Sequence, residues 1–233
     1  SKIIKKKKLW YYKKMKISLN IFTNSTISAP KTDIIRRTYD SFCETFGHEY
    51  PVTVYCDPKP NFKMSKFYFE ELKKYFPFVY KANSLSDGYI KAVNSPYNED
   101  FMFMLEHDWQ FNKHLIKHSL EEITSVMSAH GLYHLRFNKR ANVVSGWDIG
   151  LKEKKCFYSR ELELTYCETS VLSNNPHIID VKKYRQKCLP LIEIKSGSKG
   201  IEENLTHVGL VGAIYGGLNY PATVKHQDGR RSR

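Results

Sequence analysis

The residues best suited to chemistry are Glu106, His107 and Asp108, which directly follow the apolar run FMFML at residues 101–105. Charged side chains are rarely buried unless they are paired or bind a metal, so packing alone explains this arrangement poorly. On a continuing strand Glu106 and Asp108 face the same side, where they can hold a hard divalent cation such as Mg²⁺ or Mn²⁺. A strand that simply ends in a polar turn is the alternative that this pattern leaves open.

The elements before this motif predict an α/β fold. Residues 17–22 form an apolar run typical of a buried strand, and apolar residues at helical spacing follow from Thr32, with Gly47 as the stop. Residues 51–55 predict a second strand. A strand–helix–strand unit starts a parallel sheet, and ligands gather beyond the carboxyl ends of such strands. The unbroken apolar run at 101–105 predicts a central strand covered on both faces.

The later elements extend the same domain. We expect helices over 65–76, over 86–93 with Ser86 as its cap, over 112–131 with Asn112 as its cap, and over 180–188, a strand over 132–137 and an antiparallel pair between 156 and 167. The glycine-rich segment after Lys195 predicts active-site loops or a covering segment. The predicted organisation is a basic arm at residues 1–16 and a single domain at residues 17–233, with an active-site segment at its C-terminal end.

The order of these elements, with Asp57 after the second strand and an acid-x-acid motif after the apolar strand, resembles glycosyltransferases with the glycosyltransferase-A fold. The strings LSDGYIKAV, FMLEHDWQF and HQDGR, with residues 200–204 (GIEEN), resemble small glycosyltransferases of chloroviruses, of the xylosyltransferase type. This resemblance covers most of residues 15–230. It implies a single Rossmann-like, mixed and mainly parallel sheet flanked by helices. It also implies transfer of a sugar from a nucleotide-sugar, a UDP-sugar with UDP-xylose as the candidate, to a glycan acceptor.

The same resemblance assigns a metal site and a donor site. The motif of this fold holds a divalent cation, Mn²⁺ or Mg²⁺, on the donor diphosphate, and here it reads Glu106-His107-Asp108. Asp108 is therefore the expected ligand, and His226 or Asp228 is expected to close the site. Because the motif here begins with Glu rather than Asp, the resemblance leaves open whether Glu106 contacts metal, ribose or neither. The residues expected to bind the nucleotide-sugar are Thr23, Asn24, Asp57, Asp87, Lys91, Glu106, Lys225 and Arg230. For Asp87 and Lys91, an ordinary exposed helix pair is the alternative.

The resemblance also places a general base late in the chain, at the start of a helix. The matching residues are Glu202 and Glu203, and we expect Glu203 to be the base, with Glu202 next. A carboxylate there would accept the proton of the acceptor hydroxyl, and the reaction would invert the anomeric centre. An ordinary acidic first turn is the alternative. Trp109, Trp147 and Asp148 are candidates for the acceptor side, because sugars stack on aromatic faces and hydrogen-bond to carboxylates.

The net charge of +13 invites two competing interpretations. Eight of these charges come from lysines in residues 1–16 and three from residues 221–233, leaving +2 for the body. A nucleic-acid-binding protein would need a continuous basic stripe, so we expect no nucleic-acid partner. A metal-dependent nuclease or phosphohydrolase would use the same Glu106 and Asp108, but with more clustered acids.

The remaining predictions concern location. Five widely spaced cysteines without a CxxC pair indicate no disulfide framework, so we expect a cytoplasmic protein, in the host cytoplasm if the chain is viral. No apolar run approaches the length of a membrane helix. The basic, aromatic segment within residues 5–16 is suited to weak contact with an anionic membrane surface, although we favour a solvated arm.

Overall fold

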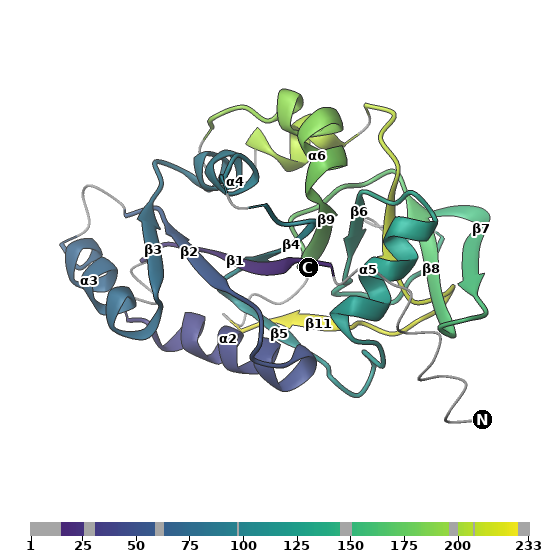
Figure 1. The fold of residues 1–233 in the computed structure, drawn as a ribbon, viewed down its shortest axis with the longest axis horizontal. Helices are drawn as coiled ribbons and strands as arrows, with labels where there is room; N and C mark the ends of the chain where they lie inside the picture. Colours follow the sequence, from purple (N-terminus) through teal and green to yellow (C-terminus); the bar gives the residue numbers. More distant parts are fainter. Residues whose placement is uncertain are drawn as a thin grey trace.

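A nine-stranded mixed sheet forms the centre of the protein (Figure 1). This computed structural model describes residues 15–25, 31–58, 63–96, 98–144, 151–195, 200–206 and 208–227. The strands of the sheet, in spatial order, are β3 (Phe78–Lys81), β2 (Val52–Cys56), β1 (Ile17–Thr23), β4 (Phe101–Glu106), β9 (His177–Asp180), β6 (His134–Arg136), β10 (Gly212–Tyr215), β8 (Leu164–Thr169) and β7 (Leu151–Ser159). A separate two-stranded sheet joins β5 (Trp109–Phe111) to β11 (Val224–His226).

The pairing directions confirm the predicted α/β class with a mainly parallel sheet. β1 lies parallel to both β2 and β4, β2 lies parallel to β3, and β10 lies parallel to β6. Only β9 and β8 run against their neighbours, so seven of the nine strands point the same way. The carboxyl ends of β1, β2, β4 and β6 therefore meet at one edge of the sheet, which we call the carboxyl edge.

Helices cover both faces of the sheet (Figure 1). Their bounds are α2 (Asp33–Phe46), α3 (Ser65–Tyr75), α4 (Leu85–Val93), α5 (Leu120–Ala129), α6 (Val181–Lys187) and the one-turn α7 (Glu202–Leu205), with a 3₁₀ turn at Leu189–Leu191. α2, α3, α5 and the β5–β11 pair pack on one face, which we call the α2 face, whereas α4, α6 and α7 pack on the other, the α4 face.

Successive side chains of β4 point to opposite faces of the sheet, so this one strand contributes residues to both cores. Phe101, Phe103 and Leu105 belong to the core of the α2 face, while Met102 and Met104 belong to the core of the α4 face. All five are at most 3% exposed. The predicted central strand, buried on both faces, is therefore confirmed.

Two predicted helix starts are wrong. The cap of α4 is Ser84, whose hydroxyl accepts the amide of Asp87, rather than Ser86. α5 begins only after Ser119, which forms a capping box with Glu122, and residues 112–119 are turns rather than helix. The predicted stop of α2 at Gly47 is confirmed, since this residue has a φ of 106° and donates its amide to Cys43.

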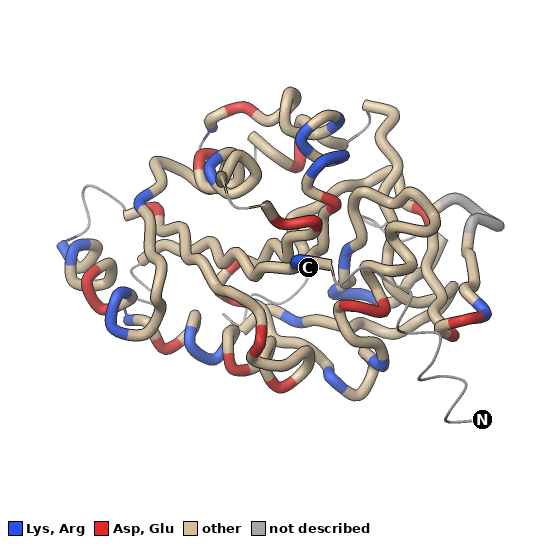
Figure 2. Tube along the Cα trace, in the orientation of Figure 1, with Lys and Arg blue, Asp and Glu red and all other residues tan. Residues whose placement is uncertain are grey.

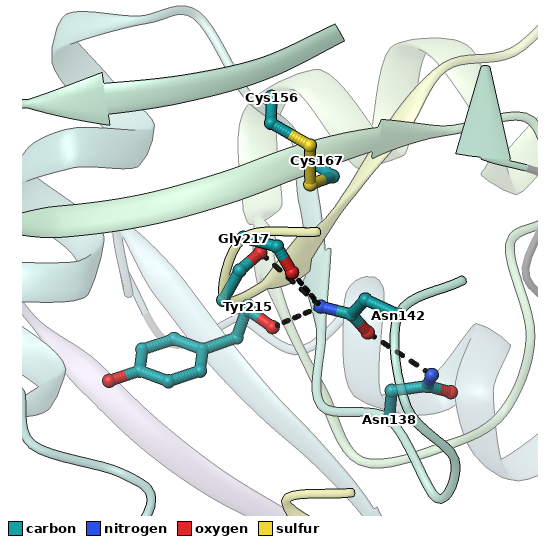
Figure 3. The surroundings of a disulfide bond; sticks show 7 residues. Asn138, Asn142, Cys156, Cys167, Tyr215 and Gly217 are labelled. Atoms are coloured by element: carbon teal, nitrogen blue, oxygen red, sulfur yellow. Dashed lines mark hydrogen bonds between the residues drawn. A yellow bond between two sulfur atoms is a disulfide. The ribbon is translucent and has the colours of Figure 1, made fainter. Parts of the chain in front are cut away.

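The expectation of unpaired cysteines is wrong for Cys156 and Cys167, which form a disulfide between the neighbouring strands β7 and β8 (Figure 3). Because cross-linked cysteines are uncommon in the cytosol, the cysteines no longer support the predicted cytoplasmic location.

Figure 3 also shows Asn142, whose amide nitrogen donates to the carbonyls of Tyr215 and Gly217 at 3.0 and 3.2 Å. This amide holds the end of β10 beside the loop that follows β6.

Acidic and basic residues are interspersed over the part of the chain that the structure describes (Figure 2). Residues 1–14 of the predicted basic arm lie outside the described residues. Within the described ranges, no helix has both the length and the hydropathy that a membrane crossing requires. The predicted division into an arm and one domain stays a prediction.

Candidate active site

The strand that carries the acid-x-acid motif ends at Glu106, and residues 107–108 form a turn into β5. Strand alternation places Glu106 on the α4 face with Met104. Asp108 precedes Trp109, which belongs to the core of the α2 face. The premise that Glu106 and Asp108 lie on a continuing strand is therefore wrong, and with it the argument that they share one side.

The C-terminal segment returns to this turn and brings His226 to Asp108. β11 pairs antiparallel with β5, with His226 opposite Trp109, and the amide of Gln227 donates to the carbonyl of Asp108 at 2.7 Å. His226 Nδ1 lies 3.4 Å from Asp108 Oδ2, and its ring packs against that of Trp109 at a tilt of 30°, with 3.8 Å between centroids. The sequence-predicted residues Asp108 and His226 are thus side by side, although 118 positions separate them in the chain.

The chemistry of this pair fits a divalent cation of the Mn²⁺ type. A carboxylate oxygen and an imidazole nitrogen are both suitable ligands, and Nδ1 of His226 is buried without a hydrogen bond to another described residue. Among the described residues there is no group of three or more His, Cys, Asp or Glu side chains arranged to hold a metal. Asp228, the third predicted ligand, and Arg230 lie outside the described residues.

The predicted nucleoside-binding residues lie at the ends of β1 and β2. The amide of Asp57 donates to the carbonyl of Thr23 at 2.9 Å, so the two strand ends are adjacent. The Thr23 hydroxyl is buried and bonds to that of Tyr68 at 2.5 Å, which makes Thr23 a support of this edge rather than an open contact. Asn24 and Asp57 are partly exposed and are the residues of this group that a ligand can reach.

Asp87 and Lys91 pair with each other on α4. Lys91 Nζ lies 2.8 Å from Asp87 Oδ2 and also donates to the carbonyl of Lys81, and the amide of Asn83 donates to the same carboxylate oxygen at 2.7 Å. Burial alone would raise the pKa of Asp87, but the hydrogen bonds from Lys91 and Asn83 outweigh it and lower the pKa. The two side chains pair as the alternative expected, but Asp87 is buried rather than exposed.

The two candidate bases differ in their surroundings. Glu202 is partly buried and its Oε1 accepts the amide of Asn174 at 2.6 Å, whereas Glu203 is exposed. Both lie in the single turn of α7. Because only a few peptide dipoles align in one turn, they stabilise an ionised carboxylate only weakly. Glu106 and Glu202 both act on the buried hydroxyl of Tyr89, whose pKa is raised first by burial and then by these two charges. The second acidic pair therefore lies on the same side of the sheet as Glu106.

Sequence reasoning missed a buried polar layer on the α4 face, beside Glu106. It contains Tyr89 from α4, His134 and Arg136 from β6, Asn174, and His177 from β9, all at most 4% exposed. The His134 and His177 rings stack at 4.5 Å, and burial lowers the pKa of His177 to about 4 and that of His134 well below its usual value. A signal was available in part, because His134 and Arg136 alternate with apolar residues in the predicted strand 132–137.

Two further predictions concern the flanks of the site. Lys225 lines an open groove of about 470 Å³ together with Arg37, Asp40 and His226, between α2 and β11. Trp109 is 3% exposed and covered by His226, so the prediction that its ring is an acceptor platform is wrong. The other acceptor candidates, Trp147 and Asp148, lie outside the described residues.

The sheet order and the helices on both faces match solved structures with the glycosyltransferase-A fold, and the central strand β4 leads into Glu106-His107-Asp108. A crystal structure of S. aureus TarS 1–349 matches with a TM-score of 0.52 and 14% identity, over 90% of this chain and 60% of that one. A crystal structure of GalNAc-T7 with UDP, GalNAc and Mn²⁺ matches with a TM-score of 0.58 and 12% identity, over 92% of this chain and 44% of that one. At these identities the likeness shows the fold alone. No protein-family model matches the sequence, and no curated protein sequence matches it.

Proposed function

We propose that this chain is a metal-dependent glycosyltransferase that moves a sugar from a nucleotide-sugar to a glycan acceptor. The observation that carries the proposal is the return of β11, which sets His226 against Asp108 at the carboxyl edge of a glycosyltransferase-A fold. GalNAc-T7, with which this chain shares that fold, is seen with UDP and Mn²⁺. We therefore propose a UDP-sugar donor, with UDP-xylose as the first candidate because of the sequence resemblance to the chlorovirus type.

Each part of the proposed site has one role. Asp108 and His226 hold the divalent cation, and Glu106 contacts the metal or the ribose. The cation, when bound, stabilises the negative charge that develops on the diphosphate leaving group. Asn24 and Asp57 line the nucleoside end, and Lys225, which lines the same groove as His226, contacts a phosphate. We assign no donor contact to the Asp87–Lys91 pair, because each already holds the other.

The proposed reaction inverts the anomeric carbon. A carboxylate of the Glu202–Glu203 pair accepts the proton of the acceptor hydroxyl as the oxygen attacks and the bond to the diphosphate breaks. An enzyme that works in one displacement needs only this single base. A two-metal nuclease would need a larger cluster of acids, and the described residues contain none. The cytoplasmic location and the contact of the arm with a membrane surface stay predictions.

Release of UDP tests the proposal. Purified chain is incubated with Mn²⁺ and a panel of UDP-sugars that includes UDP-xylose, with water or added oligosaccharides as acceptor. We expect UDP release from at least one donor, and a loss of about 100-fold or more in Asp108→Ala because the metal stabilises the leaving group. Asp33→Ala, an exposed acid on α2, is the matched control and should keep the wild-type rate. No release from any donor, or equal rates in both variants, would contradict the proposal.

A further inference from the structure

The short helix α7 cannot hold its own position. It has four residues and one turn, and a helix of this length is unstable alone in water because its few hydrogen bonds do not offset the cost of nucleation. Its core anchors are Ile201 and Leu205, both 1% exposed. These apolar contacts hold the helix against the α4 face, but they are not directional and restrain its rotation about its own axis only weakly. Its orientation must therefore be set by polar contacts.

Glu202 supplies the shortest of these contacts. Its Oε1 accepts the backbone amide of Asn174 at 2.6 Å, across 28 positions of the chain. A hydrogen bond from an amide to a carboxylate is about twice as strong as a neutral one. Two weaker ties flank it, since Asn204 Nδ2 donates to the carbonyl of Leu191 at 2.8 Å and the amide of Glu193 donates to Gly200 at 3.1 Å. A side chain at Gly200 would overlap the Glu193 carbonyl, so the chain comes close enough only because this residue is glycine.

The segment that receives Glu202 is itself fixed to the sheet. Arg136 of β6, fully buried, donates to the hydroxyl of Ser173 at 2.8 Å. Next to it, Asn175 Nδ2 lies 3.4 Å from Asn138 Oδ1, and the carbonyl of Asn175 bonds to His177 Nδ1 at 2.8 Å. Residues 173–175 therefore form a platform at the carboxyl edge that is tied to β6 and β9, and β9 pairs with the strand β4 that carries Glu106.

The neighbouring acid makes none of these contacts. Glu203 is exposed, so an incoming hydroxyl can reach it, whereas Oε1 of Glu202 is occupied by the Asn174 amide. The two carboxylates are adjacent in sequence but differ in their contacts. Glu202 is held by the protein, and Glu203 is open to a ligand.

We propose that Glu202 is a positioning residue that ties α7 to the 173–175 platform, and that Glu203 is the general base whose position this tie sets. The inference rests on the proposed function. The base belongs to a helix of one turn, and the Glu202–Asn174 bond is the one charged hydrogen bond among the contacts described above that hold this helix. Glu202 itself neither takes nor gives a proton during transfer.

Three variants separate these roles by kinetics, with the UDP-sugar that gives the fastest UDP release as donor. Glu203→Gln removes the base and should lower kcat about 10³-fold. Glu202→Ala removes the tie and should lower kcat about 10- to 100-fold through misplacement of Glu203, with little change in donor KM. Glu202→Gln keeps an oxygen that can accept the Asn174 amide and should restore kcat to within about tenfold of wild type. The acidic limb of the pH–rate profile should persist in Glu202→Gln and disappear in Glu203→Gln.

Hydrogen exchange of the Asn174 amide gives a readout that does not depend on turnover. Its protection should be lost in Glu202→Ala and kept in Glu202→Gln and Glu203→Gln. Unchanged protection in Glu202→Ala, or a Glu202→Gln variant as inactive as Glu203→Gln, would overturn the inference. If the wild-type chain releases UDP from no donor, the proposed function fails, while the exchange of Asn174 still decides whether the tie exists.

Discussion

The two faces of the sheet differ most where β4 ends. On the α2 face Phe103 lies among four other aromatic rings at centroid distances of 5.1–5.8 Å. On the α4 face the same level of the sheet carries Tyr89, His134, Arg136 and His177, all at most 1% exposed. Tyr89, His134 and His177 each have a buried polar atom without a hydrogen bond to another described residue.

This difference shows that the strand β4 separates a close-packed aromatic core from a layer of buried polar groups. Close-packed aromatic rings stabilise the fold, whereas a buried polar atom without a partner costs about 1–3 kcal/mol. On the α4 face, these destabilising buried polar atoms lie next to Glu106, Glu202 and the platform to which we assign the positioning of Glu203. Groups with altered pKa values occur on both faces, but the two buried histidines with lowered pKa values, His134 and His177, lie on the side to which we assign the base.

The largest effect on stability should come from removing a ring from the aromatic core of the α2 face. Phe103→Ala removes the ring that contacts Phe42, Phe46, Phe111 and Phe137, and we expect a loss of about 3–5 kcal/mol in the free energy of unfolding. Urea denaturation followed by tryptophan fluorescence measures this loss. Phe67→Ala is the matched control, because this ring is 67% exposed and its removal should cost less than about 0.5 kcal/mol. Equal losses in the two variants would break the distinction between core and surface on this face.

A smaller effect should come from the histidines of the polar face. Burial lowers the pKa of His177 to about 4, so the folded protein keeps this ring neutral while the unfolded chain takes up a proton below about pH 6.5. Because the unfolded state then binds more protons, stability should fall as pH falls from about 6.5 to 4, by about 1.4 kcal/mol per pH unit for this group. His134, with Arg136 beside both rings, should act in the same direction.

Denaturation of His177→Phe between pH 7 and 4.5 measures this contribution. The variant should lose about 1.4 kcal/mol per pH unit less than the wild type over the acidic range. His48→Gln, at an exposed position, is the control and should keep the wild-type slope. An unchanged slope in His177→Phe would mean that the ring is not held neutral, and the contrast between the two faces would weaken.

Sequence reasoning predicted the elements whose signals are local. Gly47 stops α2, and the run FMFML is buried on both faces, because a positive φ and an unbroken apolar pattern depend on few neighbours. β9 was missed because its four residues follow Pro176 and lead directly into α6. The pairing of Cys156 with Cys167 was missed because it depends on the register of β7 against β8.

The candidate site shows the same limit. The family resemblance pointed to Asp108 and His226, but their contact depends on the pairing of β5 with β11, which no local pattern indicates. β5 begins directly after the turn at residues 107–108. This turn interrupts the strand, so strand alternation does not place Glu106 and Asp108 on one side. Asn174 was missed because its backbone amide, rather than its side chain, makes the contact with Glu202.

Binding of UDP in the presence and absence of Mn²⁺ tests the central claim most directly. Isothermal titration calorimetry of the chain with UDP should show binding that is at least about tenfold tighter with Mn²⁺ than with EDTA, because under our proposal Asp108 and His226 would hold a cation that offsets the charge of the diphosphate. Asp108→Ala should remove this difference, and Asp33→Ala should keep it. Equal affinity for UDP with Mn²⁺ and with EDTA, or no binding of UDP at all, would contradict the account.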